Sequence, residues 1–209
     1  MRKRPPVVLV HGIWMTGIEM LWLRYRLHRC GYQTYSFHYP SLRRTPSENA
    51  ASLNRFLKKI EADRIHLLAH SLGGIVLMHL FHRYPQQKPG RVVMLGTPAK
   101  GSELARRFYR KRGLRLLLGR ACEQGLLGGA PDWPEERELG LIIGDRPLGM
   151  LAQLFGGPLE KPSDGTVRVA ETRIEQALEV LCLPVTHFSM LADRRVAVAA
   201  CRFLRAGKF

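Results

Sequence analysis

One segment, residues 67–75 with the sequence LLAHSLGGI, restricts the fold of this chain more than any other. Its first residues continue an apolar run, as a buried strand would, and the residues after it have a helical composition. A strand that passes directly into a helix turns sharply, and Ser71 stands at that turn. The small residues Ala69 and Gly73 leave room for the two backbones to approach each other. The segment therefore predicts a strand, a tight turn that strains the backbone of Ser71, and a helix.

Apolar runs and helical patterns alternate along the rest of the chain. The runs predict strands at residues 7–10, 33–37, 65–69, 91–95, 139–143 and 177–183, and the helical patterns predict helices at residues 18–29, 46–60, 72–84 and 194–205. Thr45 and Glu48 have the spacing of a capping box, with a proline at the first helical position between them. The alternation predicts an α/β fold of about six mostly parallel strands with helices on both faces. A chain of 209 residues suits a single domain with one sizeable core.

Polar residues stand at the carboxyl ends of several predicted strands, where the active sites of parallel sheets collect. They are His11, Ser71, Asp145 or Asp164, and His187. A serine hydroxyl is a weak nucleophile, and an imidazole with a pKa near about 6.5 is suited to take its proton and return it. The imidazole in turn needs a carboxylate that orients its ring. These residue types predict a serine nucleophile, a histidine base and an acid.

The position of the base follows from the order of the residues. Where a serine occupies such a turn, the acid and then the histidine come after it in the chain. The histidines beyond Ser71 are His79, His82 and His187. The first two belong to the helix that leaves the turn and cannot swing back to the serine. His187 follows the last predicted strand and is therefore the predicted base.

Three aspartates lie between the serine and this histidine. Asp164 is in the polar turn SDGTV, which is flexible enough to reach across the strand ends. Asp145 directly follows the fifth predicted strand and is its main rival. Asp132 lies in a long segment without a predicted strand and suits the role less well. From the residues alone, the choice between Asp164 and Asp145 stays open.

Attack on an acyl carbon creates an oxyanion, which two backbone N–H groups must bind. One predicted donor is the N–H of Leu72, which follows the nucleophile at the amino end of a helix. We expect the other from the loop after the first strand, at Ile13. Gly12 keeps that loop free of a side chain that would crowd the acyl group, and His11 is expected to hold the loop in shape by hydrogen bonding.

With these residues in place, the chain resembles the α/β-hydrolase superfamily, and within it lipase- and esterase-like members such as small bacterial lipases and the hydrolase domain of GPI-inositol deacylases. The matching segments are VVLVHGIW at 7–14, LLAHSLGG at 67–74, LGTPAKGSELA at 95–105, SDGTVRV at 163–169 and THFSML at 186–191. They span nearly the whole chain in the expected order. One departure is Ala69, where glycine is commoner in the superfamily.

The resemblance implies a minimal α/β-hydrolase fold and assigns a role to each matching residue. The implied catalytic triad is Ser71, Asp164 and His187, and the implied oxyanion donors are Ile13 and Leu72; the resemblance favours Asp164 over Asp145. It implies a serine hydrolase that cleaves carboxylic esters, including lipid esters, through an acyl-enzyme and without a metal or cofactor. The alternative is a thioesterase or acyltransferase that acts on acyl groups carried by coenzyme A or a carrier protein. A third possibility is a hydrolase fold that only binds lipid or protein.

A cap-like excursion is expected at residues 99–138, where this superfamily inserts its cap. Residues 104–120 within it are basic and amphipathic, which suits an anionic membrane surface or an acyl chain, but equally a helix packed on the sheet with solvated arginines. The whole chain carries a formal net charge of +16, with 33 Lys+Arg against 17 Asp+Glu. Such a surface attracts anions, among them acyl carriers. No nucleic-acid motif accompanies the charge, so no nucleic-acid partner is expected.

The cysteines and the chain start bear on the compartment. Cys30, Cys122, Cys182 and Cys201 have no paired spacing and are expected to be reduced thiols of a cytoplasmic protein. The apolar run behind the basic start is too short for a signal peptide, and no stretch reaches the roughly 18–20 apolar residues of a spanning helix. The predicted location is therefore the cytoplasm, with peripheral contact to a membrane as an option.

Overall fold

A computed structural model of the chain describes residues 4–148 and 157–209. Its centre is one six-stranded sheet in the order β2-β1-β3-β4-β5-β6, and every neighbouring pair is parallel. The strands are β1 (Val7–Val10), β2 (Thr34–Phe37), β3 (His66–His70), β4 (Val92–Leu95), β5 (Leu139–Gly144) and β6 (Glu179–Leu183). The predicted α/β fold with about six parallel strands is confirmed.

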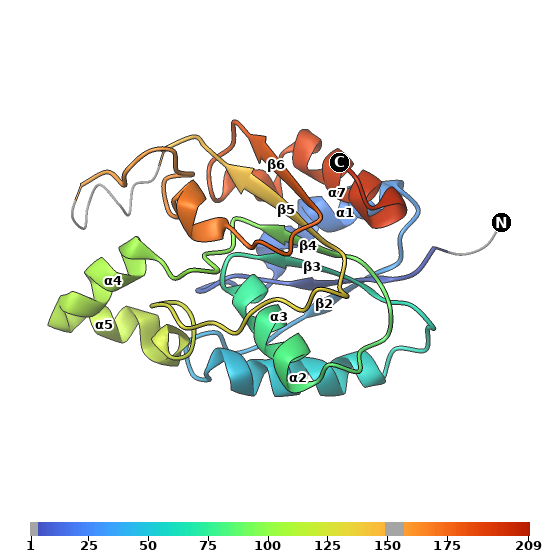
Figure 1. The fold of residues 1–209 in the computed structure, drawn as a ribbon, viewed down its shortest axis with the longest axis horizontal. Helices are drawn as coiled ribbons and strands as arrows, with labels where there is room; N and C mark the ends of the chain where they lie inside the picture. The colour runs from blue at the N-terminus through green and yellow to red at the C-terminus, as the bar shows by residue number, and fades with distance from the viewer. Residues whose placement is uncertain (1–3, 149–156) are drawn as a thin grey trace.

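Helices cover both faces of this sheet (Figure 1). One face carries α2 (Pro46–Lys58) and α3 (Leu72–Arg83), and the other carries α1 (Leu21–Arg29) and α7 (Arg194–Ala206). Side chains alternate between the faces of each strand, so the sheet packs into two separate apolar cores. The four central strands are buried along their length, because helices cover them on both sides.

The termini of the helices follow local sequence signals. Thr45 accepts a hydrogen bond from the Glu48 N–H while Glu48 accepts one from the Thr45 N–H, so the predicted capping box forms. Asp193 caps α7, and Gly207 ends that helix in the left-handed conformation (φ 76°). The segment predicted as one helix from residue 18 begins instead with a short 3₁₀ turn, η1 (Ile18–Met20), because Gly17 before it has φ 96° and offers no side-chain cap. The remaining 3₁₀ turns are η2 (Gly119–Cys122), η3 (Val169–Thr172) and η4 (Ser189–Leu191).

The excursion at residues 99–138 contains no strand of the sheet, as predicted, and contributes α4 (Glu103–Arg110) and α5 (Arg112–Leu118). Both helices lie beyond one end of the sheet, next to neither of its covered faces (Figure 1). Their apolar side chains form a third core with Leu72 and Ile75 at the start of α3. The excursion therefore packs directly over the turn that holds Ser71. The Gly- and Pro-rich loop expected before Ser163 lies partly outside the described residues.

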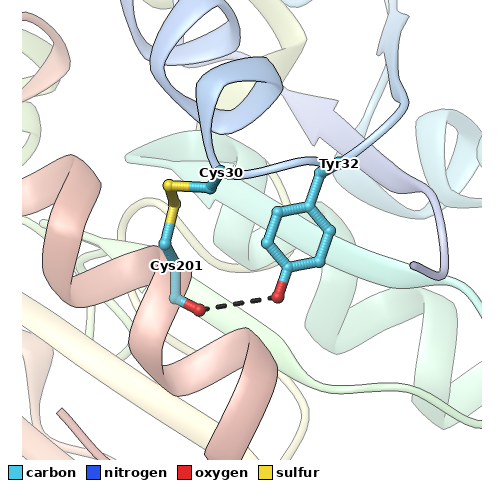
Figure 2. The surroundings of a disulfide bond; sticks show 3 residues. All are labelled: Cys30, Tyr32 and Cys201. Atoms are coloured by element: carbon cyan, nitrogen blue, oxygen red, sulfur yellow. Dashed lines mark hydrogen bonds between the residues drawn. A yellow bond between two sulfur atoms is a disulfide. The ribbon is translucent and has the colours of Figure 1, made fainter. Parts of the chain in front are cut away.

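The expectation that all four cysteines are reduced is wrong for two of them. A disulfide joins Cys30, at the end of α1, to Cys201 in α7, with their Cα atoms 6.4 Å apart (Figure 2). Tyr32 lies beside it, and its hydroxyl donates a hydrogen bond of 3.5 Å to the Cys201 carbonyl. The pairing has no sequence signature because 171 positions separate the two residues and only the fold brings them together. Cys122 and Cys182 are free.

No helix within the described part of the chain has both the length and the apolar character to cross a bilayer.

Candidate active site

Ser71 lies between the last residue of β3 and the first residue of α3. Its backbone has φ 53° and ψ −122°, a conformation that costs a non-glycine residue about 1–3 kcal/mol. A Cβ atom on Gly73 would be 2.5 Å from the Val10 carbonyl oxygen, and one on Gly74 would be 2.1 Å from Thr97 Oγ1. Neither approach leaves room for a Cβ atom without a shift, so α3 packs closely against the end of β1 and the residues after β4 because these two positions are glycine.

Asp164 and His187 form a buried pair at the same edge of the sheet. The His187 Nδ1–H donates a hydrogen bond of 2.6 Å to Asp164 Oδ2, and the two side chains are 3% and 1% exposed. The other carboxylate oxygen, Oδ1, accepts from the backbone N–H groups of Thr166 at 2.9 Å and Val167 at 2.7 Å. A further bond, from the His187 N–H to the Asp164 carbonyl, joins the two loops. The carboxylate and the ring therefore have little freedom to rotate.

The two rival aspartates lie away from this pair. Asp145 is exposed, and its carboxylate accepts a weak hydrogen bond of 3.6 Å from the Cys182 thiol. Asp132 is exposed within the excursion. The structure thus places Asp164 next to His187, and places neither Asp145 nor Asp132 there.

His70, which the sequence reasoning did not single out, connects the serine turn to the Asp164–His187 pair. It is the last residue of β3, is fully buried, and directly precedes Ser71. Its Nε2–H donates a hydrogen bond of 3.0 Å to the His187 carbonyl, and the two rings lie 4.7 Å apart. Burial, and then the neighbouring His187, lower the pKa of His70 well below its usual value, so the ring is neutral. A histidine at the end of a largely apolar strand, directly before the serine, was the one sequence signal of such a role.

Within residues 4–148 and 157–209, no hydrogen bond joins the Ser71 hydroxyl to the His187 ring. Both residues instead relate to the end of β4. A Cβ on Gly96, at the end of β4, would be 3.1 Å from both Asp164 Oδ2 and His187 Nδ1, while the Ser71 N–H donates to the carbonyl of the preceding residue, Leu95. Catalytic hydrogen bonds are often long without substrate and shorten when it binds.

The loop after β1 supplies N–H groups beside the serine. The N–H groups of Ile13 and Leu72 make no hydrogen bond to an acceptor in the described part of the chain. A Cβ on Gly12 would be 3.2 Å from Ser71 Cβ, so this loop passes very close to the serine. His11 holds the loop from behind: its Nδ1–H donates to the Gly12 carbonyl at 2.8 Å, and its ring stacks on Tyr39 at 4.2 Å. Burial lowers the pKa of His11, which keeps the ring neutral.

A small, partly open apolar cavity of about 40 Å³ includes Ser71 in its lining. Its lining comes from the loop after β1, the start of α3 and the excursion, and includes Ile13, Trp14, Leu104, Phe108, Leu118 and Leu126. The Trp14 indole N–H donates a hydrogen bond of 2.7 Å to the Leu117 carbonyl and thereby ties the loop to α5. Trp133, near the other end of the excursion, lies instead in the core under α2 and α3, where it packs on Phe81.

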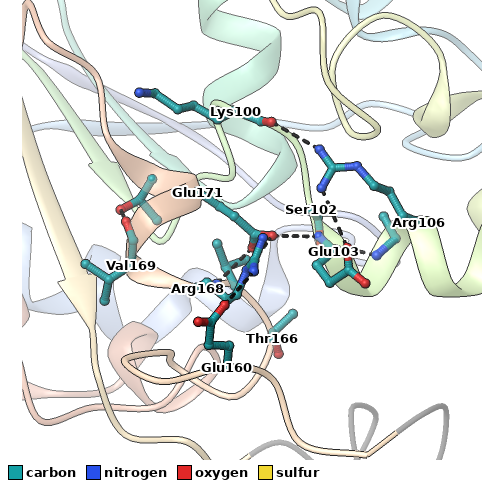
Figure 3. A network of polar contacts seen from close by, with 12 residues as sticks. Lys100, Ser102, Glu103, Arg106, Glu160, Thr166, Arg168, Val169 and Glu171 are labelled. Atoms are coloured by element: carbon teal, nitrogen blue, oxygen red, sulfur yellow. Dashed lines mark hydrogen bonds and ion pairs between the residues drawn. The ribbon is translucent and has the colours of Figure 1, made fainter.

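A polar network connects the loop that carries Asp164 to the excursion (Figure 3). Its centre is Glu171, which is 3% exposed and accepts hydrogen bonds from the Glu103 N–H at 2.7 Å and the Arg168 N–H at 2.9 Å. The Arg168 guanidinium contacts both Glu171 and Glu160, each at 3.1 Å. Because Glu103 is the first residue of α4, the network fixes that helix relative to the turn at residues 163–168. Among the residues whose positions are described, no group of three or more His, Cys, Asp or Glu side chains could hold a metal ion.

Residues 2–140 match the family model described as "Domain of unknown function (DUF7379)". The chain belongs to this family. The match covers the loop after β1, the serine turn and the whole excursion, and ends in β5. A comparison of the sequence with curated proteins finds no match.

Several solved structures of lipases and esterases are similar to this DUF7379 member at low sequence identity. Bacillus licheniformis lipase BlEst2 in mature form is 19% identical, with a TM-score of 0.79, and the match covers 100% of this chain and 94% of that one. The metagenomic carboxyl esterase MGS0156 is 18% identical, with a TM-score of 0.68 and coverage of 91% and 66%. Phospholipase PlaB from Legionella pneumophila is 16% identical, with a TM-score of 0.71 and coverage of 97% and 60%. The chain therefore has the α/β-hydrolase fold, which confirms the implied fold class.

Proposed function

We propose that this DUF7379 member is a serine hydrolase that cleaves carboxylic esters through an acyl-enzyme intermediate. The observation that carries the proposal is the Asp164–His187 pair, which is buried against His70 and so lies beside the strained turn of Ser71. The lipase and esterase neighbours support the same reaction class, since a hydrolase fold with these residue types at the strand ends suits acyl transfer.

In the proposed reaction, His187 accepts the Ser71 proton at Nε2 as the hydroxyl oxygen attacks the acyl carbon. Asp164 keeps the proton on Nδ1 and stabilises the imidazolium that forms. The N–H groups of Ile13 and Leu72 bind the oxyanion, each worth about 2.7–4 kcal/mol to the barrier. His187 then gives the proton to the departing alcohol, and a water molecule releases the acid from the serine by the same steps in reverse order.

The small cavity beside Ser71 favours a short acyl group. Its volume of about 40 Å³ is small, since on this measure a single water molecule already needs about 10–15 Å³. Phe108 and Leu118 from the excursion line it and restrict its length. Longer acyl chains require the excursion to move away from the loop after β1, which breaks the bond between Trp14 and Leu117.

Fluorophosphonate labelling combined with a series of p-nitrophenyl esters tests the proposal. We expect the label on Ser71 alone, turnover that is highest for the shortest acyl groups, and loss of both labelling and turnover in Ser71→Ala. The matched control is Ser102→Ala, which changes another serine at the cavity. An unlabelled wild-type protein that turns over no ester of any length contradicts the proposal.

A second candidate function keeps the same residues but takes an acyl group from a thioester of coenzyme A or a carrier protein. An open groove of about 580 Å³ favours it, since this groove borders Trp14 and is lined by His38 and Arg43, and both carriers are anionic. Acyl-CoA hydrolysis that falls steeply with rising salt supports this alternative, whereas indifference to salt contradicts it.

A further inference from the structure

The outer surface of η1 and α1 exposes a continuous apolar stripe. Ile18, Leu21, Trp22 and Tyr25 are 67%, 51%, 59% and 51% exposed. Their spacing of three and four residues places them on one side of the helix, while side chains on the opposite side, such as Leu23, are buried in the core. Four large apolar residues in a row on a surface helix are characteristic of a contact surface rather than of scattered exposure.

Arginines border this stripe on the side of α7. A groove of about 360 Å³ runs between α1 and α7 and is lined by Tyr25, Arg26, Arg29, Arg194 and Val198. The three guanidinium groups have no carboxylate partner in the part of the chain that the structure describes. The segment from Leu21 to Arg29 itself contains no acidic residue. The groove is therefore positive and open to an anionic ligand.

The disulfide makes the stripe and the groove one rigid surface. Cys30 lines the groove and is bonded to Cys201, so α1 and α7 are linked covalently at this point (Figure 2). Both helices cover the same face of the sheet (Figure 1). The arginines of the two helices hence keep a constant spacing relative to Trp22 and Tyr25.

We propose that this surface, formed by Ile18, Leu21, Trp22, Tyr25, Arg26, Arg29, Arg194 and Val198, binds an anionic phospholipid bilayer. Indole and phenol rings prefer the interface between headgroups and acyl chains, and leucine and isoleucine side chains insert below it. Guanidinium groups form paired hydrogen bonds with phosphate, which suits the groove to lipid headgroups. The excess of cations over acids on α1 complements the negative surface of such a membrane.

The surface also has a defined relation to the cavity. The stripe begins four residues after Trp14, which lines the cavity beside Ser71. A protein docked through the stripe holds the loop after β1 close to the membrane. The proposal concerns membrane binding alone, so its test does not depend on the chemistry proposed for Ser71.

Flotation with vesicles tests the proposal on the full-length protein. The two vesicle types are phosphatidylcholine alone and phosphatidylcholine mixed with phosphatidylglycerol. We expect binding to the mixed vesicles, little binding to the neutral ones, and binding that decreases as salt increases. In Arg29→Gln/Arg194→Gln, the partition coefficient falls roughly 25-fold, since each arginine contributes about fivefold. In Leu21→Ser/Trp22→Ser, binding is lost.

The matched control is Lys58→Gln/Lys59→Gln, which removes the same charge from the end of α2, on the other face of the sheet. It is expected to keep at least half of the wild-type partition. Thermal unfolding followed by circular dichroism verifies that each variant folds. Absence of wild-type binding to mixed vesicles overturns the proposal, and so does equal weakening in the arginine and lysine variants. Equal wild-type binding to neutral and anionic vesicles overturns the role of the arginines.

Discussion

The turn at Ser71 and the Asp164–His187 pair are held in place by different kinds of force. Close packing holds the turn, because its two glycines lie where any Cβ atom would overlap the Val10 carbonyl or the Thr97 side chain. The pair is polar: the Asp164 carboxylate accepts three hydrogen bonds, from Thr166, Val167 and His187. The first is visible in the sequence as two small residues shortly after the serine, although their contacts with Val10 and Thr97 are long-range, whereas the second depends on two loops that leave no such pattern. Substitutions that affect one region should therefore leave the other largely intact.

The largest effect is expected from a change in the polar region. Asp164→Asn removes the acceptor of the His187 Nδ1–H and favours the tautomer with the proton on Nε2, where the base must be free. We expect kcat for a short-chain ester to fall roughly 10⁴-fold, with fluorophosphonate labelling slowed in parallel. Asp145→Asn is the matched control, since Asp145 is exposed and has no contact with His187. Equal losses in both variants would contradict the assignment of the acid.

The corresponding change in the steric region should act on folding. Gly73→Ala places a Cβ atom 2.5 Å from the Val10 carbonyl oxygen, a contact that only a backbone shift can relieve. We expect the free energy of unfolding to decrease by about 3–5 kcal/mol, measured by urea denaturation. Gly113→Ala is the control: this helical glycine has no atom within 4 Å of its added Cβ, so the variant should gain about 1 kcal/mol from helix propensity. A Gly73→Ala protein as stable as the wild type would show that the turn tolerates a side chain.

The difference between the two regions also explains what the sequence could predict. The strands, the four helices that cover the sheet and the glycine-rich turn were predicted to within a few residues, because hydrophobic periodicity and the small residues of the turn can be read from consecutive positions. The choice between Asp164 and Asp145 stayed open on the residues alone, since a hydrogen bond between distant loops leaves no pattern in either. Glu171 was missed for the same reason: its bond to the Glu103 N–H joins residues 68 positions apart.

The disulfide and the exposed stripe show the same limit. Cys30 and Cys201 have ordinary helical surroundings in the sequence, and only the packing of α1 against α7 reveals the bond. The residues from Ile18 to Tyr25 read as a normal amphipathic helix, because periodicity does not tell which apolar side chains the core accepts. Long-range packing therefore determines both features.

Lowering the pH should have a smaller effect on stability, which acts at the first residue of β3, the strand that ends at Ser71. Burial, and then the nearby Arg91 and Arg64, lower the pKa of His66 from 6.5 to about 4. Because the unfolded chain binds the proton more readily, the stabilisation is complete above pH 6.5 and is lost as the pH falls towards 4. The shift corresponds to about 3 kcal/mol. We expect His66→Asn, which keeps an acceptor for the Arg91 N–H, to unfold with a weaker pH dependence in this range.

The pH prediction is checked by urea denaturation at several pH values between 4 and 7. His28→Asn is the control, since that histidine is exposed on α1. An unchanged pH dependence in His66→Asn would mean that other groups cause the acid sensitivity. His70 also has a lowered pKa, so part of the dependence should remain in the variant.

The smallest predicted effect concerns His70, the residue that joins the two regions. The His187 carbonyl can only accept a hydrogen bond, so the neutral His70 ring must carry its proton on Nε2, and its Nδ1 has no partner among the described residues. His70→Phe keeps a ring against His187 but removes the donor, which frees the backbone that carries the base. We expect kcat to fall about tenfold while KM stays the same, because the ester is still bound but the base is misaligned. His70→Gln, whose amide N–H reaches the same carbonyl, should recover most of the loss.

The matched control for His70→Phe is His79→Phe, which removes an equivalent bond, from His79 Nε2 to the Gln124 carbonyl at 2.6 Å, on the far side of the serine turn. This variant should lower stability without changing kcat. If His70→Phe likewise lowers stability alone, His70 is a core residue only, and the turn and the pair are aligned independently of each other.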